Sequence, residues 1–208
     1  MFATEQGIDL DYKVVDLVTG EHLKPDFASI NPNCMVPVLE DGEFRLTESA
    51  TILRYLAEKT GSPAYPKDLK ARARVDEMMD WLNANIYKDF GYGLIYPQTF
   101  PHHKRPGDAV QAGTIDWGKQ KTQAWLKILD EKLIGAGKPY LCGNAITLAD
   151  YMGAEILAVG SLIRCSYAAY PNIERWMRNM RALKNWPKVH EAIDGFAASL
   201  KDQSFVAI

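Results

Sequence analysis

Hydrophobic and polar positions divide the chain into a short mixed first part and a long helical second part. Residues 12–17 are rich in β-branched and aromatic side chains, which favours a strand. The runs 36–39 and 43–46 flank the turn dipeptide Asp41-Gly42, a pattern typical of a β-hairpin. Apolar residues at helical spacing follow Ser49, which predicts a helix with Ser49 as its N-cap and Gly61 at its end.

Beyond the turn-rich segment 61–66, every periodic stretch has the repeat of an amphipathic helix. Helices are predicted near residues 69–96, 109–134, 148–164, 172–182 and 187–200. The segment from Thr147 to Asp150 resembles a capping box, with Asp in place of the usual Glu. The pattern therefore predicts an α/β unit over residues 1–62, followed by an all-helical unit over residues 63–208.

The first residues predict the end of a helix, because Glu5-Gln6-Gly7 has the form of a glycine C-cap. Only about a turn and a half of helix could precede that cap, and so short a helix is not stable alone. We therefore expect the chain to begin inside an element of structure. The residues at Met1 lack the pattern of a signal peptide.

Composition and charge exclude several classes of function. The formal net charge is −2, so we expect no broad positive surface for nucleic acid or an anionic membrane. The most apolar stretch, residues 151–163, is too short to cross a bilayer and contains Glu155. Three scattered cysteines form no disulfide framework and no Cys-x-x-Cys pair, which favours a reducing, cytoplasmic location.

Four pieces of sequence, in order along the chain, resemble the cytosolic glutathione transferase superfamily, in particular its theta, delta and bacterial members. They are Gly20-Glu21-His22 leading to Phe27 and Ile30-Asn31-Pro32, then Val36-Pro37-Val38-Leu39, then residues 47–56 (Thr-Glu-Ser-Ala-Thr-Ile-Leu-Arg-Tyr-Leu), and finally the capping segment 147–150 behind Tyr-Leu-Cys-Gly. Each piece alone is weakly specific, but the four pieces in this order and at these separations are quite specific to the family. The resemblance covers essentially the whole chain from Met1.

This resemblance implies a fold, a reaction and partners. The fold is an α/β thioredoxin-like N-terminal domain that binds glutathione, followed by an all-α C-terminal domain that supplies the pocket for the second substrate. The reaction is transfer of glutathione, as cosubstrate, to a small apolar electrophile, or the reduction of disulfides and peroxides. We expect a homodimer in the cytoplasm, no metal, and neither nucleic acid nor membrane as a partner.

By resemblance, Glu48 and Ser49 bind the γ-glutamyl end of glutathione. The start of a helix offers free N–H groups and a positive dipole to a carboxylate, and Glu48 could meet the ammonium group. As an isolated pair, these residues would be an ordinary N-cap and a first-turn acid. Behind the Val-Pro hairpin we favour ligand binding.

Val36-Pro37 resembles the cis-proline of thioredoxin folds. There the main chain of the preceding residue pairs with the cysteinyl part of glutathione like an added strand. The alternative is a trans proline that enters an edge strand. His22 either reaches the glycyl carboxylate or is merely solvated. The loop Cys34-Met35 departs from the family, which frequently has a cationic or histidine residue there, and nothing in the sequence makes Cys34 reactive.

Aromatic residues gather on the first long helix, where the family lines its electrophile pocket: Trp81, Tyr87, Phe90, Tyr92, Tyr96 and Phe100. Packing in the core or a dimer is the alternative for most of them. Gly91 and Gly93 predict a kink or a close approach in this helix. We expect residues 102–106 to be an exposed loop, because two adjacent histidines lack the spacing of a helical metal pair.

Family members carry a strand and the start of helix 1 before the segment that matches Met1, with a Ser, Tyr or Cys that activates the thiol. The sequence shows no such segment, so no catalytic residue can be named. Two hypotheses therefore remain. One is a glutathione transferase, and the other is a non-catalytic module that kept the fold for binding or assembly.

Overall fold

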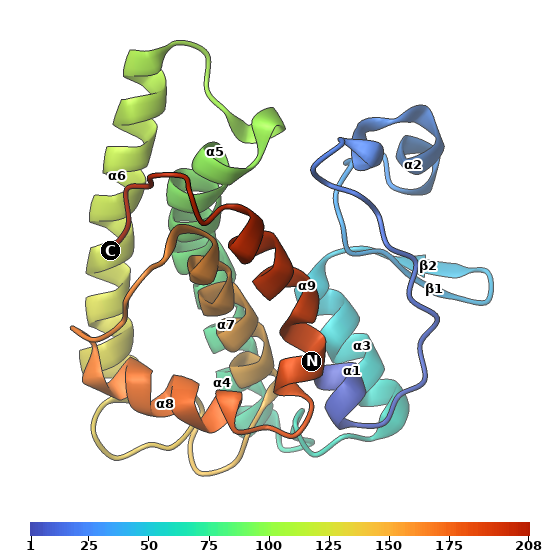
Figure 1. Cartoon of the computed structure of the whole chain (residues 1–208). Helices are drawn as coiled ribbons and strands as arrows, with labels where there is room; N and C mark the ends of the chain where they lie inside the picture. Colours follow the sequence, from blue (N-terminus) through green and yellow to red (C-terminus); the bar gives the residue numbers. More distant parts are fainter.

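The computed structural model describes residues 1–208 and consists of a small part beside a larger helical part (Figure 1). The small part holds α1 (Phe2–Glu5), the 3₁₀ helix η1 (Glu21–Leu23), α2 (Pro25–Ile30), β1 (Leu39–Asp41), β2 (Phe44–Leu46) and α3 (Ser49–Thr60). The larger part holds α4 (Leu69–Trp81), η2 (Leu82–Tyr87), η3 (Phe90–Ile95), α5 (Tyr96–Thr99), η4 (Pro101–His103), α6 (Asp108–Ile128), η5 (Leu129–Ile134), α7 (Leu148–Ala158), η6 (Val159–Ile163), α8 (Pro171–Arg181) and α9 (Trp186–Ser199). None of these helices combines the length and the apolar character needed to span a bilayer.

The predicted hairpin is confirmed. Strands β1 and β2 pair antiparallel, with Leu39 opposite Leu46 and Asp41 opposite Phe44. Gly42 turns the chain between them with φ of 61°, a left-handed conformation that favours glycine. This hairpin is the whole sheet.

The strand predicted over residues 12–17 is wrong. The segment carries no strand, and the main chain of residues 9–15 makes no main-chain hydrogen bond. Val14 is 89% exposed and Tyr12 is 68% exposed. A strand exists only with a hydrogen-bonded neighbour, and no residue of the chain pairs with this segment. High β-propensity alone therefore leaves it as an exposed connection.

The short helix α1 ends as predicted, with Gly7 at φ of 65°. Tertiary contacts hold it in place. Phe2 is buried with its ring 5.4 Å from that of Tyr151. The carboxylate of Glu5 accepts a hydrogen bond from the main chain of Asn185. Packing against distant helices thus stabilises an element that could not persist alone.

The predicted long helices are confirmed, and several continue as π-helical or 3₁₀ turns. The stretch predicted over 69–96 is α4 followed by η2 and η3, and the stretch over 109–134 is α6 followed by η5. The predicted close approach is at Gly93, which faces Gly118 of α6. A Cβ atom at Gly118 would lie 2.4 Å from the carbonyl carbon of Gly93, so two glycines let η3 and α6 meet main chain to main chain.

Helix α7 lies at the centre of the core. Nine of its eleven residues are buried, and its N-terminus has the predicted capping box between Thr147 and Asp150. One hydrophobic cluster includes Phe2 and Leu56 of the small part together with Leu148 and Trp176 of the helical part. The two parts therefore share a core.

Candidate functional site

The loop before β1 has a fixed main chain with two apolar side chains at its surface. Asn31 is 2% exposed; its Nδ2 donates to the carbonyl oxygen of Met35 at 2.7 Å, and its Oδ1 accepts from the N–H of Asn33 at 3.0 Å. The Val36–Pro37 peptide bond is cis, as the sequence context predicted. Met35 and Val36 are 50% and 40% exposed, so main chain and side chains here are open to a ligand.

Asn31 positions the main chain of this loop. That role was not predicted from the sequence, where Asn31 was only one residue of the family resemblance. The signal was available, because Asn followed by Pro commonly starts a turn whose side chain bonds to the main chain nearby.

Glu48 and Ser49 lie at the start of α3. The predicted N-cap is one residue off: Glu48 is the N-cap, with φ of 66°, and Ser49 is the first helical residue. No side chain caps this end of the twelve-residue helix, and both residues are exposed. Its first N–H groups therefore remain available, and the positive end of the helix dipole adds attraction for a carboxylate.

His22 is buried, which excludes the alternative that it is merely a solvated loop histidine. It is 5% exposed, and its Nδ1 has no hydrogen-bond partner. Its ring lies 4.6 Å from that of His102. The exposed loop predicted over residues 102–106 is only partly correct, because residues 101–103 form the 3₁₀ helix η4. His103 packs against Tyr92 and Tyr96, whereas His102 is exposed. His22 and His103 pack against rings from other elements, and the sequence around each histidine does not predict these contacts.

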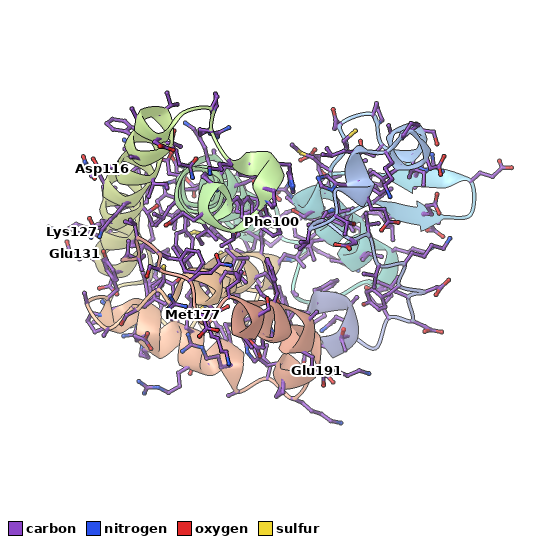
Figure 2. All side chains as sticks on the ribbon, turned by 45° about the horizontal axis from the view of Figure 1, so that its top comes forward. Phe100, Asp116, Lys127, Glu131, Met177 and Glu191 are labelled. Atoms are coloured by element: carbon purple, nitrogen blue, oxygen red, sulfur yellow. The ribbon has the colours of Figure 1, made fainter.

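An aromatic wall, formed by Tyr87, Tyr92, Tyr96 and Phe100, faces the same region. Adjacent rings lie 5.1–5.3 Å apart, and the hydroxyls of Tyr87 and Tyr96 are joined by a hydrogen bond of 2.8 Å. Figure 2 shows Phe100 at the boundary between the two parts of the molecule. Trp81 and Phe90 do not belong to this wall: Phe90 is fully buried beside Tyr167, and Trp81 packs on Trp125.

Glu48 and the aromatic wall are electrostatic neighbours. Burial, the nearby phenol of Tyr87 and its hydrogen bond raise the pKa of Tyr92 to about 12, and the negative charge of Glu48 adds to that rise. Burial also raises the pKa of Tyr96. The hydroxyls of Tyr92 and Tyr96 therefore stay protonated near neutral pH and remain hydrogen-bond donors.

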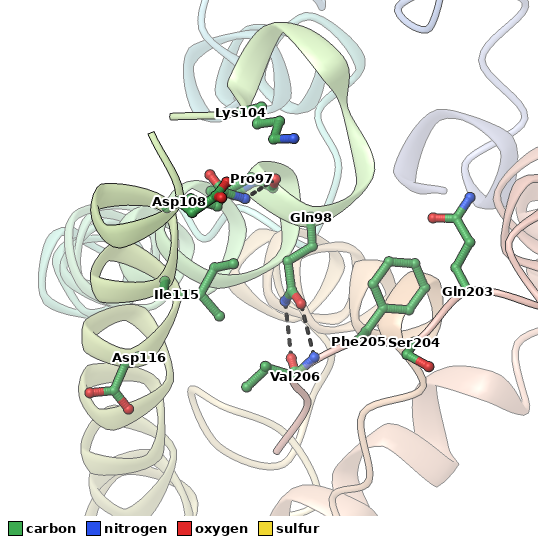
Figure 3. A pocket seen from close by; sticks show the side chains of 12 residues that line it. Pro97, Gln98, Lys104, Asp108, Ile115, Asp116, Gln203, Ser204, Phe205 and Val206 are labelled. Carbon is green, nitrogen blue, oxygen red and sulfur yellow. Dashed lines mark hydrogen bonds between the residues drawn. The ribbon is translucent and has the colours of Figure 1, made fainter. Parts of the chain in front are cut away.

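A cavity lies away from these residues. It measures about 570 Å³ and is bounded by α5, α6 and the C-terminal tail, which Gln98 holds through two hydrogen bonds to the main chain of Val206 (Figure 3). None of the residues predicted to contact glutathione lines it. The candidate site is therefore the exposed loop and helix start described above, with the aromatic wall beside them.

Comparisons with known proteins show the family to which the chain belongs. The family profile described as "Glutathione S-transferase, N-terminal domain" matches residues 2–58, and that described as "Glutathione S-transferase, C-terminal domain" matches residues 104–184. Human glutathione S-transferase theta-1 is 33% identical over 199 residues, which cover 93% of this chain and 82% of the relative. Rat theta-2 is 33% identical, with 88% of this chain and 74% of the relative covered.

Solved structures give the same result. A crystal structure of human glutathione transferase theta-2 in complex with glutathione superposes with a TM-score of 0.82 at 29% identity, covering 100% of this chain and 86% of that one. A human theta-class enzyme in complex with the glutathione conjugate of 1-menaphthyl sulfate also gives 0.82, at 31% identity, with 96% and 82% covered. The predicted fold class, thioredoxin-like followed by all-helical, is confirmed. The chain belongs to the glutathione S-transferase family of enzymes and is theta-like.

Proposed function

We propose that the chain binds glutathione across the cis-proline loop and the start of α3, and transfers it to a small apolar electrophile held against the aromatic wall. One observation supports this most strongly: the uncapped N-terminus of α3, with Glu48 and Ser49 exposed, lies within electrostatic range of Tyr92. An anion site beside an apolar wall suits a ligand with a charged peptide body and a reactive group directed at the wall.

Each end of glutathione has a complementary partner. The γ-glutamyl carboxylate accepts hydrogen bonds from the N–H and hydroxyl of Ser49, and its ammonium group pairs with the carboxylate of Glu48. The main chain of Val36 extends along the cysteinyl residue as a strand would. The uncharged side chain of Met35 lies beside this contact. The glycyl carboxylate of glutathione is directed toward His22.

In the reaction the sulfur of glutathione, as thiolate, forms a bond to the electrophilic carbon while the leaving group departs with its bonding pair. The thiol proton passes to solvent. The protonated hydroxyls of Tyr92 and Tyr96 can donate a hydrogen bond to the leaving group. We assign no residue to activation of the thiol.

The remaining proposals concern organisation. We propose a boundary between glutathione-binding and helical domains near residues 62–63, a homodimer, and a cytoplasmic location. Phe44 supports the dimer, because it is 49% exposed on the hairpin beside Tyr55, and a second copy would cover it. Three free cysteines support a reducing compartment.

Transfer to a benzylic chloride, followed as thioether formation, tests the proposal. We expect Ser49→Ala to raise KM for glutathione about tenfold or more with little change in kcat, since a hydrogen bond to a charged group is lost. Glu48→Ala should behave similarly. Glu43→Ala, an exposed acid at the hairpin turn, is the control and should match the wild type. A folded chain that binds glutathione without transfer would instead favour the non-catalytic assembly module.

A further inference from the structure

The aromatic wall ends in residues 97–105, called here the wall segment. These residues include most of α5 and all of η4, and they carry Phe100 and His103. The rings of both side chains lie 5.3 Å from the ring of Tyr96. The position of the wall segment therefore sets the end of the surface against which the proposed electrophile lies.

The wall segment cannot hold its own conformation. Helix α5 has four residues and η4 has three, and helices of that length do not persist without tertiary contacts. Tyr96 and Phe100 belong to the wall. Pro97 and Gln98, in contrast, line the cavity of about 570 Å³, together with residues of α6 and the C-terminal tail (Figure 3). The side of the segment that faces the cavity therefore has little packing to hold it.

Two glutamine side chains hold the wall segment on its cavity side. Gln111, on α6, donates from Nε2 to the carbonyl oxygen of Pro97 at 2.6 Å and accepts at Oε1 from the N–H of Arg105 at 2.8 Å. One amide thus bonds to both ends of the segment. Gln98 bonds twice to the main chain of Val206, at 2.9 and 3.0 Å. Besides bonds within the helical run that leads into it, these four hydrogen bonds join the wall segment to the rest of the chain.

The amide of Gln111 matches the two groups that it joins. A carbonyl oxygen needs a donor and an N–H needs an acceptor, and an uncharged amide offers both on one side chain. The main-chain N–H of Gln111 bonds to the carbonyl oxygen of Gly107 at 3.0 Å, within the first turn of α6. Since α6 has 21 residues, Gln111 attaches the short wall segment to one of the long helices of the molecule.

We propose that Gln111 is a positioning residue for the electrophile, because it keeps Phe100 and His103 in line with the tyrosines of the wall. The proposal rests on the proposed function and deepens it, since it names the residue that sets the size of aromatic electrophile accepted. The ring centroids of Tyr92, Tyr96 and Phe100 follow one another at 5.1 and 5.3 Å. The intact wall is therefore longer than one benzene ring and suits an electrophile with two fused rings.

A two-ring electrophile should therefore depend on Gln111 more than a one-ring electrophile does. We expect Gln111→Ala to raise KM for chloromethylnaphthalene about five- to tenfold, because apolar contact with the end of the wall is lost. The value of kcat should change by less than about twofold, since Gln111 does not touch the reacting atoms. The KM for benzyl chloride should rise by less than about threefold, and that for glutathione by less than about twofold.

Initial rates of thioether formation with the two chlorides measure this difference. Gln123→Ala, which removes an exposed glutamine from the same helix, is the matched control and should behave as the wild type. Gln98→Ala is the second variant. It frees the same segment from the C-terminal tail, so it should also raise the ratio of the two KM values.

Amide hydrogen exchange of the free chain, followed by mass spectrometry, tests the restraint without any substrate. We expect peptides from residues 97–105 to exchange several times faster in Gln111→Ala than in the wild type, because the segment opens more often. Peptides from α3, which carries Ser49, should keep the exchange rate of the wild type. Gln123→Ala should leave both regions unchanged.

The outcomes separate the two proposals. An unchanged KM for chloromethylnaphthalene in a folded Gln111→Ala chain would overturn the positioning role and leave the proposed function intact. An equal rise in KM for both chlorides and for glutathione would also overturn it, because the whole site would then have loosened. If Gln111→Ala does not fold, an unchanged KM ratio in Gln98→Ala overturns the role. A folded wild-type chain that transfers glutathione to neither chloride would overturn both proposals.

Discussion

At the scale of single residues, the carboxylate of Asp150 joins segments that are distant in the chain. It is fully buried and accepts hydrogen bonds from the N–H and hydroxyl of Thr147, the N–H of Leu141 and the Nε1 of Trp176, all at 2.8–2.9 Å. The sequence predicted the bonds to Thr147, because a capping box is local. The contact with Trp176 depends on how α8 packs against α7, and no local pattern contains that information.

We therefore expect Asp150→Ala to lower the free energy of unfolding by about 3 to 5 kcal/mol, because it leaves several buried donors unpaired. Urea unfolding followed by circular dichroism measures this loss. Asp11→Ala, an exposed acid, is the control and should change stability by less than about 0.5 kcal/mol. A loss below about 1 kcal/mol in Asp150→Ala would show that the network matters little.

At the scale of elements, the crossing of η3 and α6 depends on the pair Gly93 and Gly118. A Cβ on Gly118 would lie 2.4–2.8 Å from main-chain atoms of Gly93 and Leu94, which cannot move independently of their helix. Gly118→Ala should therefore separate the two elements and cost about 2 kcal/mol or more in unfolding free energy.

Gly113 provides a matched control on the same helix. Nothing lies within 4 Å of a Cβ built there, so Gly113→Ala should stabilise the chain by up to about 1 kcal/mol through helix propensity. Opposite signs for the two substitutions in urea unfolding are the expected result. Equal effects would contradict a role for close packing at this crossing.

Elements with a strong internal pattern could be predicted, and those defined by a partner could not. The helices of the second part and the Asp41-Gly42 hairpin follow from periodicity and turn chemistry within a few residues. Residues 12–17 have the composition of a strand but no partner, so propensity failed there. The π-helical turns after α4 and α6 likewise arise from packing, and no residue in them predicts the change from α-helix to π-helix.

At the scale of the whole molecule, His190 and Glu155 hold the last helix, α9, against α7. His190 is 3% exposed; its Nδ1 donates to the carbonyl oxygen of Trp186 at 2.8 Å, and its Nε2 lies 3.4 Å from a carboxylate oxygen of Glu155. Burial alone would lower the pKa of His190. The interaction with Glu155, the carbonyl of Trp186 and the charge of Asp194 together outweigh burial and raise the pKa of His190.

This ion pair makes stability depend on pH. A raised folded pKa stabilises the fold fully below the unfolded value of about 6.5, and the contribution is lost as pH rises through the folded pKa. The stability difference between the wild type and Glu155→Gln should therefore be larger at pH 6 than at pH 9. Glu191→Gln, an exposed acid on α9, should show no such change in urea unfolding. A constant difference for Glu155→Gln would rule out the pair.

The proposed site could be predicted where its residues are close together in the sequence, and could not where two distant parts of the chain meet. Glu48, Ser49 and the cis bond of Val36-Pro37 lie within one hairpin-to-helix segment, so their order in the sequence placed them together. His22 and His102 become neighbours only through the docking of η1 on η4. Asn31 acts through its side-chain bonds to the loop, which become clear only in three dimensions.

The central claim is that residues 1–208 form a glutathione site, and one calorimetric titration with glutathione at pH 7 tests it most directly. The account predicts saturable binding of one glutathione per chain, which Ser49→Ala weakens strongly. A chain that circular dichroism shows to be folded, and that gives no binding at millimolar glutathione, would contradict the account.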